Sequence, residues 1–302
     1  MDEIHLIYNP ISGMARSARA AKALAHLLRK DGWKVEVHAT QKPGHATRLA
    51  QNLKARAHML VTIGGDGTIN EVVNGLGDSP LPIGIVPRGA ANVLAKELGL
   101  PRAVRKAKRI IEEGSVAKLD VGVVGGRRFL LMAGVGLDAR ATAVVHSRRT
   151  GSVNFFNYAA AVLKTIAVGH RFPELQIVVD GEEVKKDVRL AIVGNVRSYG
   201  GPFEFTSFAR PDDALLDICL FEKTTQFDLL RFLWASFTKT HLNYSDVHYM
   251  RGKEIVITAD ESVPYQLDGD PAGSLPARFT VLPQVLPIVV DKAWKTLWEN
   301  AS

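Results

Sequence analysis

Apolar and polar positions follow two alternating periods along the first part of the chain. Short apolar runs have the length and β-branched content of buried strands, and they are expected at residues 4–8, 35–38, 59–63 and 83–86. Between these runs, apolar side chains repeat at helical spacing, which predicts helices at 16–30 and 45–55, after the glycines at 64–65, and twice more before Gly114. Strands that alternate with helices indicate βαβ units, so the fold class expected here is a doubly wound parallel α/β domain.

After about Lys118 the pattern changes to short alternating runs over residues 174–221 and 252–290, which favours an antiparallel β-sandwich. Asp180-Gly181 lies between apolar runs at 176–179 and 184–193, and this dipeptide is typical of a hairpin turn. Helices are expected at 153–168 and 227–238. The predicted domains are residues 1–123 and 124–302, with the last segment returning to the first domain and the active site in the cleft between them.

Composition narrows the possible partners. The formal net charge is +7, which suits nucleotide phosphates or anionic lipid headgroups. The sequence has no lysine-rich tail and no zinc-finger spacing, so nucleic acid is not an expected partner. No apolar stretch reaches the roughly 18 residues of a membrane span. The acidic start, Met1-Asp2-Glu3, and the single cysteine, Cys219, indicate a cytoplasmic protein.

The strongest local signal is the glycine loop Gly64-Gly65-Asp66-Gly67-Thr68, which joins an apolar strand to a helix. Glycines let the backbone approach a ligand, and the N-terminus of a helix offers unpaired N–H groups and a positive dipole end. The spacing of Thr68 and Glu71 predicts a capping box at the start of the helix. The loop is therefore predicted to hold phosphate, the alternative being a glycine-rich βα turn without a ligand. Asp66 would bind Mg²⁺ or position a hydroxyl group.

Two further polar turns are predicted on the same edge of the sheet, because both follow strands. One contains Arg88, Ala90 and Asn92, and the other begins at Asn9. Arg88 is either a phosphate ligand or a solvated turn residue. Ligands bind at the carboxyl ends of strands in doubly wound sheets, so the three turns together indicate one nucleotide site.

These motifs resemble those of the diacylglycerol kinase catalytic-domain family of lipid kinases. The first half carries Asn9-Pro-x-Ser-Gly13, the glycine loop followed by Asn70-Glu71, and Gly89-x-x-Asn92. The second half carries, in the family's order, Gly134-Val-Gly136-Leu-Asp138-Ala139, Gly194-Asn195 with Tyr199-Gly200-Gly201, Asp212-Asp213-Ala-Leu-Leu-Asp217 and Asp268-Gly269-Asp270. The resemblance therefore covers nearly the whole chain.

The resemblance implies an ATP- and Mg²⁺-dependent kinase that phosphorylates the hydroxyl group of a membrane lipid. It assigns ATP binding to Asn9, Thr40, Gly64, Gly65, Asp66, Gly67, Thr68, Asn70, Glu71, Arg88, Ala90 and Asn92. Asp66 would also belong to the catalytic network, and either Asp268 or Asp270 would be the catalytic base. A structural Mg²⁺ site would use Asp213 with the backbone carbonyls of Arg210 and Leu215.

Two departures from the family pattern affect these assignments. Many members have threonine where this chain has Ala90, so one hydrogen bond to the nucleotide is missing. The family's Asp-Gly-Glu motif ends here in Asp270, whose side chain is one methylene shorter. The resemblance leaves the acceptor lipid open.

Residues 139–173 contain no Asp or Glu and mix basic with aromatic side chains, among them Arg148, Arg149 and Phe155. The segment is either a docking surface for the inner face of an anionic membrane or a packed helix with a basic outer face.

Three other functions remain open at the level of sequence. Gly134-Val-Gly136-Leu-Asp-Ala139 fits a dinucleotide-binding fingerprint, but no acidic residue follows between Asp138 and Glu174 where the ribose would need one. A small-molecule kinase of the NAD kinase type and a non-catalytic nucleotide- or lipid-binding protein are the alternatives. Zinc chemistry is not expected, since the nine histidines show no His-x3-His pair.

Overall fold

The computed structural model describes residues 3–13, 16–136, 139, 172–184, 187–199 and 201–294. The chain divides into two compact units, Met1–Leu119 with Gln284–Ser302, and Asp120–Pro283. The unit boundaries fall inside two long strands, β5 (Ser115–Val124) and β18 (Ala277–Val290), which contribute residues to both units. The helix expected at 153–168 lies outside the described residues.

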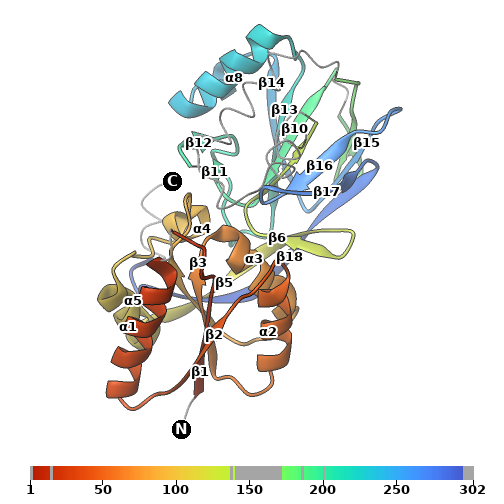
Figure 1. Ribbon diagram of the computed structural model, residues 1–302. Coiled ribbons are helices and arrows are strands. Elements are labelled where there is room, and N and C mark those ends of the chain that lie inside the picture. Colours follow the sequence, from red (N-terminus) through yellow and green to blue (C-terminus); the bar gives the residue numbers. More distant parts are fainter. Residues whose placement is uncertain are drawn as a thin grey trace. The chain divides into compact units, whose positions relative to one another are not determined.

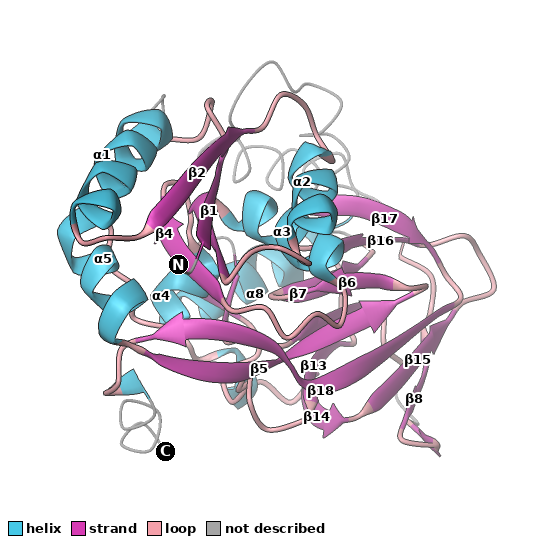
Figure 2. Ribbon diagram, turned by 90° about the horizontal axis from the view of Figure 1, so that it is seen from below, coloured by secondary structure: helices cyan, strands magenta, loops and turns pink. Residues whose placement is uncertain are grey.

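The first unit is a doubly wound α/β domain, as the alternation of strand and helix patterns predicts. Its parallel sheet has the order β2-β1-β3-β4-β18. The strands besides β18 are β1 (Glu3–Tyr8), β2 (Lys34–Ala39), β3 (Met59–Gly64) and β4 (Ile83–Pro87). The helices are α1 (Arg16–Lys30), α2 (His45–Leu53), α3 (Asp66–Leu76), α4 (Val93–Glu97) and α5 (Val104–Glu113). Figures 1 and 2 show α1 and α5 on one face of the sheet and α2 and α3 on the other.

The strand order creates a topological switch point between β1 and β3. From β1 the chain moves outward to β2, and it then crosses over to β3 on the opposite side of β1. Loops that leave two such strands diverge to opposite faces of the sheet, and the space at their carboxyl ends is where doubly wound folds bind ligands. In this chain those loops begin at Asn9 and at Gly65.

The second unit is a β-sandwich-like domain of two antiparallel sheets. One sheet has the order β14-β13-β10-β7-β16-β17, and the other runs from β18 through β15 and β8 to β9. The strands of the first sheet are β7 (Met132–Val135), β10 (Leu190–Gly194), β13 (Leu216–Phe221), β14 (Val247–Gly252), β16 (Pro264–Leu267) and β17 (Asp270–Ser274). The second contains β8 (Gln176–Val179), β9 (Glu182–Glu183) and β15 (Glu254–Thr258), and β6 (Arg127–Phe129) pairs with β5. The remaining elements are β11 (Ser198–Tyr199), β12 (Phe203–Glu204), α8 (Gln226–Thr238) and the short 3-10 helix η1 (His241–Asn243).

One hydrophobic core joins the two sheets of this unit. Val193 and Leu220 come from the first sheet, and Ile255 and Phe279 from the second. Because side chains alternate across a strand, β13 turns Leu220 into this core and Phe221 to the opposite face of its sheet. There the ring of Phe221 contacts Phe232 of α8, with ring centroids 4.7 Å apart. Helix α8 therefore covers the outer face of the first sheet.

The hairpin predicted at Asp180-Gly181 is present, but its second strand is much shorter than predicted. Both turn residues have positive φ, 50° and 88°, as a two-residue turn between twisted strands requires. The return strand is only Glu182–Glu183, and Leu190–Gly194 instead pairs with β7 and β13 in the other sheet. The apolar pattern of 184–193 could not distinguish one strand from two segments in different sheets.

Candidate functional site

In the first unit, the ends of four parallel strands are tied together by backbone hydrogen bonds. Thr40, just after β2, donates its N–H to the Tyr8 carbonyl at 2.9 Å, and Asn9 donates to the Ile63 carbonyl at 3.3 Å. Arg88, just after β4, donates to the Gly64 carbonyl at 2.6 Å. The structure thus brings Asn9, Thr40, the glycine loop and the Arg88 turn to one edge, at the switch point.

Helix α3 begins at Asp66, directly within the glycine loop. Its N-cap is Gly65, and no side chain caps the end of the helix. The predicted capping box of Thr68 and Glu71 is wrong, because the helix begins two residues before Thr68. The carboxylate of Glu71 instead accepts the N–H groups of Gly44 and Ala46, each at 3.0 Å, and so caps the start of α2.

The glycine loop and the turn after β4 touch through their glycines. A Cβ atom placed on Gly65 would lie 2.9 Å from the Cα of Gly89, and a Cβ on Gly89 would clash with the Cα of Gly65. The third turn approaches as closely, since a Cβ on Gly13 would meet the carbonyl oxygen of Arg88. Only residues without a side chain let the three turns approach one another this closely.

Asp66 holds two of these turns together. Its Oδ2 accepts the N–H of Val93 at 3.1 Å and its Oδ1 that of Leu94 at 3.2 Å, both at the start of α4. Burial raises the pKa of Asp66, and backbone N–H donors oppose that rise. The carboxylate predicted to bind Mg²⁺ therefore also fixes the position of α4 relative to the glycine loop.

Among the predicted nucleotide ligands in the turn after β4, two have side chains that are hydrogen-bonded within the protein and one is exposed. The guanidinium of Arg88 donates to the carbonyls of Pro87 and Arg102 at 2.8 and 2.7 Å, and burial lowers its pKa. Asn92 has φ of 50°, and its side chain both accepts the N–H of Gly89 and donates to the Gly89 carbonyl. Ala90, by contrast, is exposed at the tip of the turn.

In the second unit, the two candidate bases have different surroundings. Asp268 and Gly269 form the two-residue turn between β16 and β17, with φ of 50° and 88°. The Asp268 carboxylate accepts the N–H of Leu130 at 2.8 Å, of Leu131 at 2.8 Å and of Met132 at 3.1 Å. Three donors occupy the oxygens that a proton acceptor would need.

Asp270 is the first residue of β17, and its side chain is 38% exposed. Its Oδ2 lies 3.9 Å from the Nη2 of Arg127, which is beyond hydrogen-bond distance. The Asp270 carboxylate is thus partly exposed, whereas the Asp268 carboxylate accepts three backbone N–H groups.

The predicted Mg²⁺ site lies in the turn before β13. Carboxylate and carbonyl oxygens at Asp213, Arg210 and Leu215 are hard ligands, so the donor set fits this ion in kind. In the structure Asp213 is paired with the guanidinium of Arg251, and its Oδ1 accepts the N–H of Leu215 at 3.2 Å. Burial raises the pKa of Asp213.

Sequence reasoning assigned no role to two carboxylates that complete this turn. Asp120 accepts the N–H of Ala214 at 2.7 Å and so holds Ala214 in its left-handed conformation, with φ of 62°. Asp217 is fully buried, accepts the Tyr249 hydroxyl at 2.6 Å, and has its Oδ2 without a hydrogen-bond partner; burial raises its pKa to about 6. The Asp213-x3-Asp217 spacing places both carboxylates at the entrance to one strand, which could have pointed to Asp217.

Other predicted features fall outside the described residues. They are most of the basic and aromatic segment at 139–173, together with Asp138 and Gly200. None of the helices in the described residues combines the length and the hydropathy of a membrane span.

Comparison with known proteins supplies the family. Residues 3–124 match the diacylglycerol kinase catalytic domain, and residues 132–290 match the YegS C-terminal NAD kinase beta sandwich-like domain. A diacylglycerol kinase of Staphylococcus carnosus is 30% identical over 95% of this chain and 94% of its own length. One from Bacillus subtilis is 28% identical over 97% of both chains.

A solved structure has the same fold. The crystal structure of a diacylglycerol kinase from Bacillus anthracis superposes with a TM-score of 0.75 at 21% identity, covering 97% of this chain and 98% of that one. At this identity the similarity concerns the fold alone.

Proposed function

Because the chain belongs to the diacylglycerol kinase catalytic-domain family, we propose that it transfers the γ-phosphate of ATP to the hydroxyl group of a diacylglycerol-like membrane lipid. The observation that carries the proposal is the start of α3, where no side chain caps the helix. This helix end lies at the β1/β3 switch point, next to the contact between Gly65 and Gly89. Unpaired N–H groups at the end of a helix attract phosphate, and glycine leaves room for it to approach.

In this proposal the three turns bind ATP. Asn9, Thr40 and the glycine loop contact the nucleotide, and Asp66 keeps the loop and α4 in register through its two N–H bonds. Mg²⁺ that arrives with ATP supplies positive charge to offset the charge of the phosphates. At the second ion site, Asp213 and the carbonyls of Arg210 and Leu215 would hold Mg²⁺, whose charge would offset the buried carboxylates there.

We assign the role of catalytic base to Asp270 rather than Asp268. The base must accept the proton of the lipid hydroxyl as the oxygen attacks phosphorus, so it needs an accessible oxygen. Asp270 is partly exposed, whereas the Asp268 carboxylate already accepts three backbone N–H groups. The side chain of Asp270 is shorter than the glutamate found in the family. The lipid hydroxyl must therefore lie closer to the backbone of this residue.

The test is transfer of labelled γ-phosphate from ATP, with Mg²⁺, to a lipid extract in detergent micelles. Wild-type protein is expected to label a lipid, and Asp270→Asn to lower the rate by about 100- to 10,000-fold. Asp260→Asn changes an exposed carboxylate of the same unit and serves as the matched control. Undiminished labelling by Asp270→Asn would remove this base assignment. No labelled lipid with the wild type would remove the lipid kinase proposal.

The same assay with NAD as acceptor addresses the second candidate. The second unit matches a domain described as NAD kinase beta sandwich-like, and a phosphorylated dinucleotide without any labelled lipid would favour that activity.

A further inference from the structure

A cluster of two histidines and a glutamate lies on β1 and β2, and none of the three residues has been given a role above. His5 comes from β1, and Glu36 and His38 come from β2. In the parallel register His5 pairs with Glu36 and Ile7 with His38, so side chains two apart on each strand project from the same face. The register alone therefore gathers three metal-binding side chains on one face of two neighbouring strands.

The spacing of the three ligand atoms fits one small ion. His5 Nδ1 and His38 Nε2 are 3.0 Å apart, and Glu36 Oε2 is 3.6 Å from the first and 3.7 Å from the second. Ligands about 2.0 to 2.1 Å from a tetrahedral ion are about 3.3 Å from one another. The three atoms thus approximate one face of a tetrahedron, with a fourth position left for water.

The surroundings also favour a bound cation. His5 is fully buried, and its other ring nitrogen, Nε2, lies 3.4 Å from Glu3 Oε1 without a hydrogen bond to it. His38 and Glu36 are 21% and 40% exposed, so an ion can enter from solvent.

Other contacts of these three side chains compete with a metal ion for the ligand atoms. The Nη2 of Arg56 lies 3.7 Å from Glu36 Oε2, and the two histidines can share a proton when no ion is present. A surface ion pair of this kind contributes about 0 to 1 kcal/mol, so it can yield to a metal.

We propose that His5, Glu36 and His38 form a binding site for a divalent transition-metal ion of the zinc type, which fixes the edge strand β2 to β1. Two imidazole nitrogens and one carboxylate suit Zn²⁺ or Co²⁺ and not Mg²⁺, which prefers oxygen ligands. The site is therefore distinct in chemistry from the Mg²⁺ that a kinase uses.

The test is titration of the full chain, prepared without a histidine tag, with Co²⁺ and with Zn²⁺. We expect one equivalent of Co²⁺ to give the intense visible bands of a tetrahedral site, and Zn²⁺ to displace it. His38→Ala and Glu36→Gln are each expected to weaken binding by more than about 100-fold. His26→Ala, which removes an exposed histidine elsewhere in the unit, is expected to bind as the wild type does.

Thermal unfolding gives an independent measurement. Zn²⁺ should raise the wild-type midpoint and leave the His38→Ala midpoint unchanged, whereas Mg²⁺ should affect both equally. The proposal is overturned if no stoichiometric ion binds, or if His38→Ala and wild type bind Co²⁺ equally well.

A separate observation concerns the outer face of α8. Phe227, Leu230, Trp234 and Phe237 recur every three or four residues, so they form one apolar stripe, with Phe227 75% and Trp234 66% exposed. The opposite face of the helix is buried through Phe232 on Phe221. Large aromatic side chains are rarely left exposed in such a row, so the stripe indicates a contact surface.

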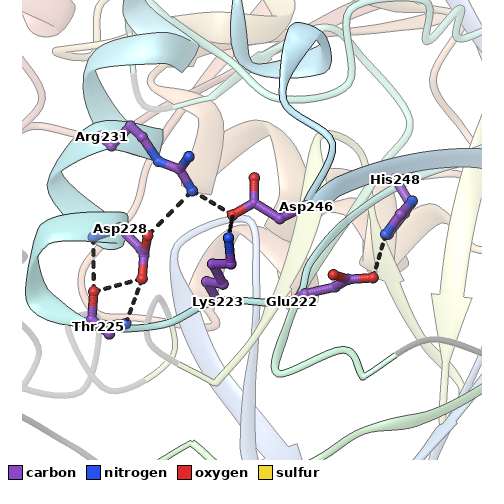
Figure 3. Close-up of polar contacts among 7 residues, drawn as sticks. All are labelled: Glu222, Lys223, Thr225, Asp228, Arg231, Asp246 and His248. Atoms are coloured by element: carbon purple, nitrogen blue, oxygen red, sulfur yellow. Dashed lines mark hydrogen bonds and ion pairs between the residues drawn. The ribbon is translucent and has the colours of Figure 1, made fainter.

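The helix is held firmly while the stripe stays exposed. Figure 3 shows Thr225 and Asp228 forming the capping box at its start, and Arg231 bridging Asp228 and Asp246 at 3.2 and 2.5 Å. Lys223 lies 3.7 Å from Asp246 in the same network. Asp228 and Asp246 are thus each paired with a cationic side chain in this network.

Charge around the stripe complements an anionic surface. Lys223 and Lys239 lie at the two ends of the helix, and each is 63% exposed although it pairs with a carboxylate, Asp246 at 3.7 Å and Glu204 at 2.6 Å. Residues 223–240 present no exposed acidic side chain. Tryptophan and phenylalanine prefer the headgroup boundary of a bilayer, and lysine adds attraction to anionic lipid.

We infer that the stripe on α8 docks the protein on an anionic lipid bilayer, which rests on the proposed function because the substrate is then a membrane lipid. The test is co-sedimentation with vesicles of phosphatidylglycerol and phosphatidylcholine. The double variant Phe227→Ser/Trp234→Ser is expected to lose at least about tenfold in vesicle binding, while Val116→Ser, an exposed apolar residue of β5, keeps wild-type binding.

Rates in micelles separate this inference from the proposed function. The double variant should phosphorylate lipid in detergent micelles at the wild-type rate and lose activity only on vesicles. Unchanged vesicle binding by the double variant overturns the inference. A wild-type dimer that becomes monomeric in the double variant also overturns it, since the stripe would then bind a second copy. If the wild type labels no lipid in micelles but still binds vesicles, the result contradicts the kinase proposal and leaves the docking inference standing.

Discussion

At the scale of single residues, some carboxylates of the candidate sites hold backbone segments in place, and others are partly exposed. Asp66 and Asp268 belong to the motifs that carry the family resemblance, yet each accepts at least two backbone N–H groups from a neighbouring segment. The Asp270 carboxylate is partly exposed, and its Oδ2 lies 3.9 Å from the Nη2 of Arg127. The Asp268-Gly269-Asp270 motif thus combines a carboxylate that holds the backbone in place with one that is exposed for reaction.

We therefore expect Asp268→Asn to act on stability. An amide has one accepting oxygen, and its NH₂ group would face an N–H donor, so the variant should lose about 1 to 3 kcal/mol of unfolding free energy. Urea denaturation followed by circular dichroism measures this loss. Asp270→Asn should unfold at the wild-type urea concentration, and equal midpoints for Asp268→Asn and wild type would contradict the structural role given to Asp268.

At the scale of elements, close contacts between turns decide whether the nucleotide site can form. Gly89 lies against Gly65, and an added methyl group on Gly89 would force the two turns apart. Gly67, in the first turn of α3, has no atom near the position of an added Cβ.

Gly89→Ala should accordingly destabilise the first unit by about 1 to 3 kcal/mol, because the added methyl overpacks the contact. Gly67→Ala should leave the stability unchanged or raise it by up to about 1 kcal/mol, since alanine favours the helix. The unfolding midpoints of the two variants in urea give the comparison. Equal stability of both would mean that the Gly65–Gly89 contact is not tight in solution.

The packing of η1 beneath α8 introduces a dependence on pH. His241 is fully buried, with its Nε2 2.9 Å from the Phe205 carbonyl, and burial lowers its pKa below 6.5. A depressed histidine pKa gives stability that is present above the unfolded value and lost as the pH falls through the folded value.

Lowering the pH from about 7.5 to about 5 should therefore reduce the melting temperature more in the wild type than in His241→Gln, whose amide cannot become charged. Glutamine can still donate to the Phe205 carbonyl, so the variant is expected to fold. Parallel melting curves for the two proteins across this pH range would show that His241 is not the group responsible.

At the scale of the whole molecule, the chain starts in the α/β unit, builds the sandwich and returns through β18 to complete the first sheet. Both candidate ligand sites of the first unit, the glycine turns and the His5 cluster, depend on the same parallel strands. Binding at either site should stabilise the folded protein, because the unfolded chain lacks both.

ATP with Mg²⁺ should thus raise the stability of the wild type by about 2.7 kcal/mol when present at 100 times its dissociation constant. Gly89→Ala should show a much smaller shift, since its turns are displaced. Calorimetry of both proteins with and without ATP measures the effect. An equal shift in the variant would place the nucleotide elsewhere.

Much of the fold follows from local pattern. The 3.6-residue repeat of α1 and the apolar runs of β1, β3 and β4 predicted these elements within one residue at each end, because burial on one face or on both dictates the pattern. The same reasoning located the glycine turns at strand ends, and hence the edge where they meet.

What the sequence by itself determined is the alternation of strands and helices in the first unit, the two fold classes and the residues of the glycine and Asp-Gly motifs. Tertiary structure alone decided the partners of these residues. It moved the start of α3 to Asp66, gave Glu71 to α2, bound Asp268 to three N–H groups and gathered His5 with Glu36 and His38. Such pairings join residues far apart in the chain, and they depend on strand register and side-chain direction, which periodicity does not encode.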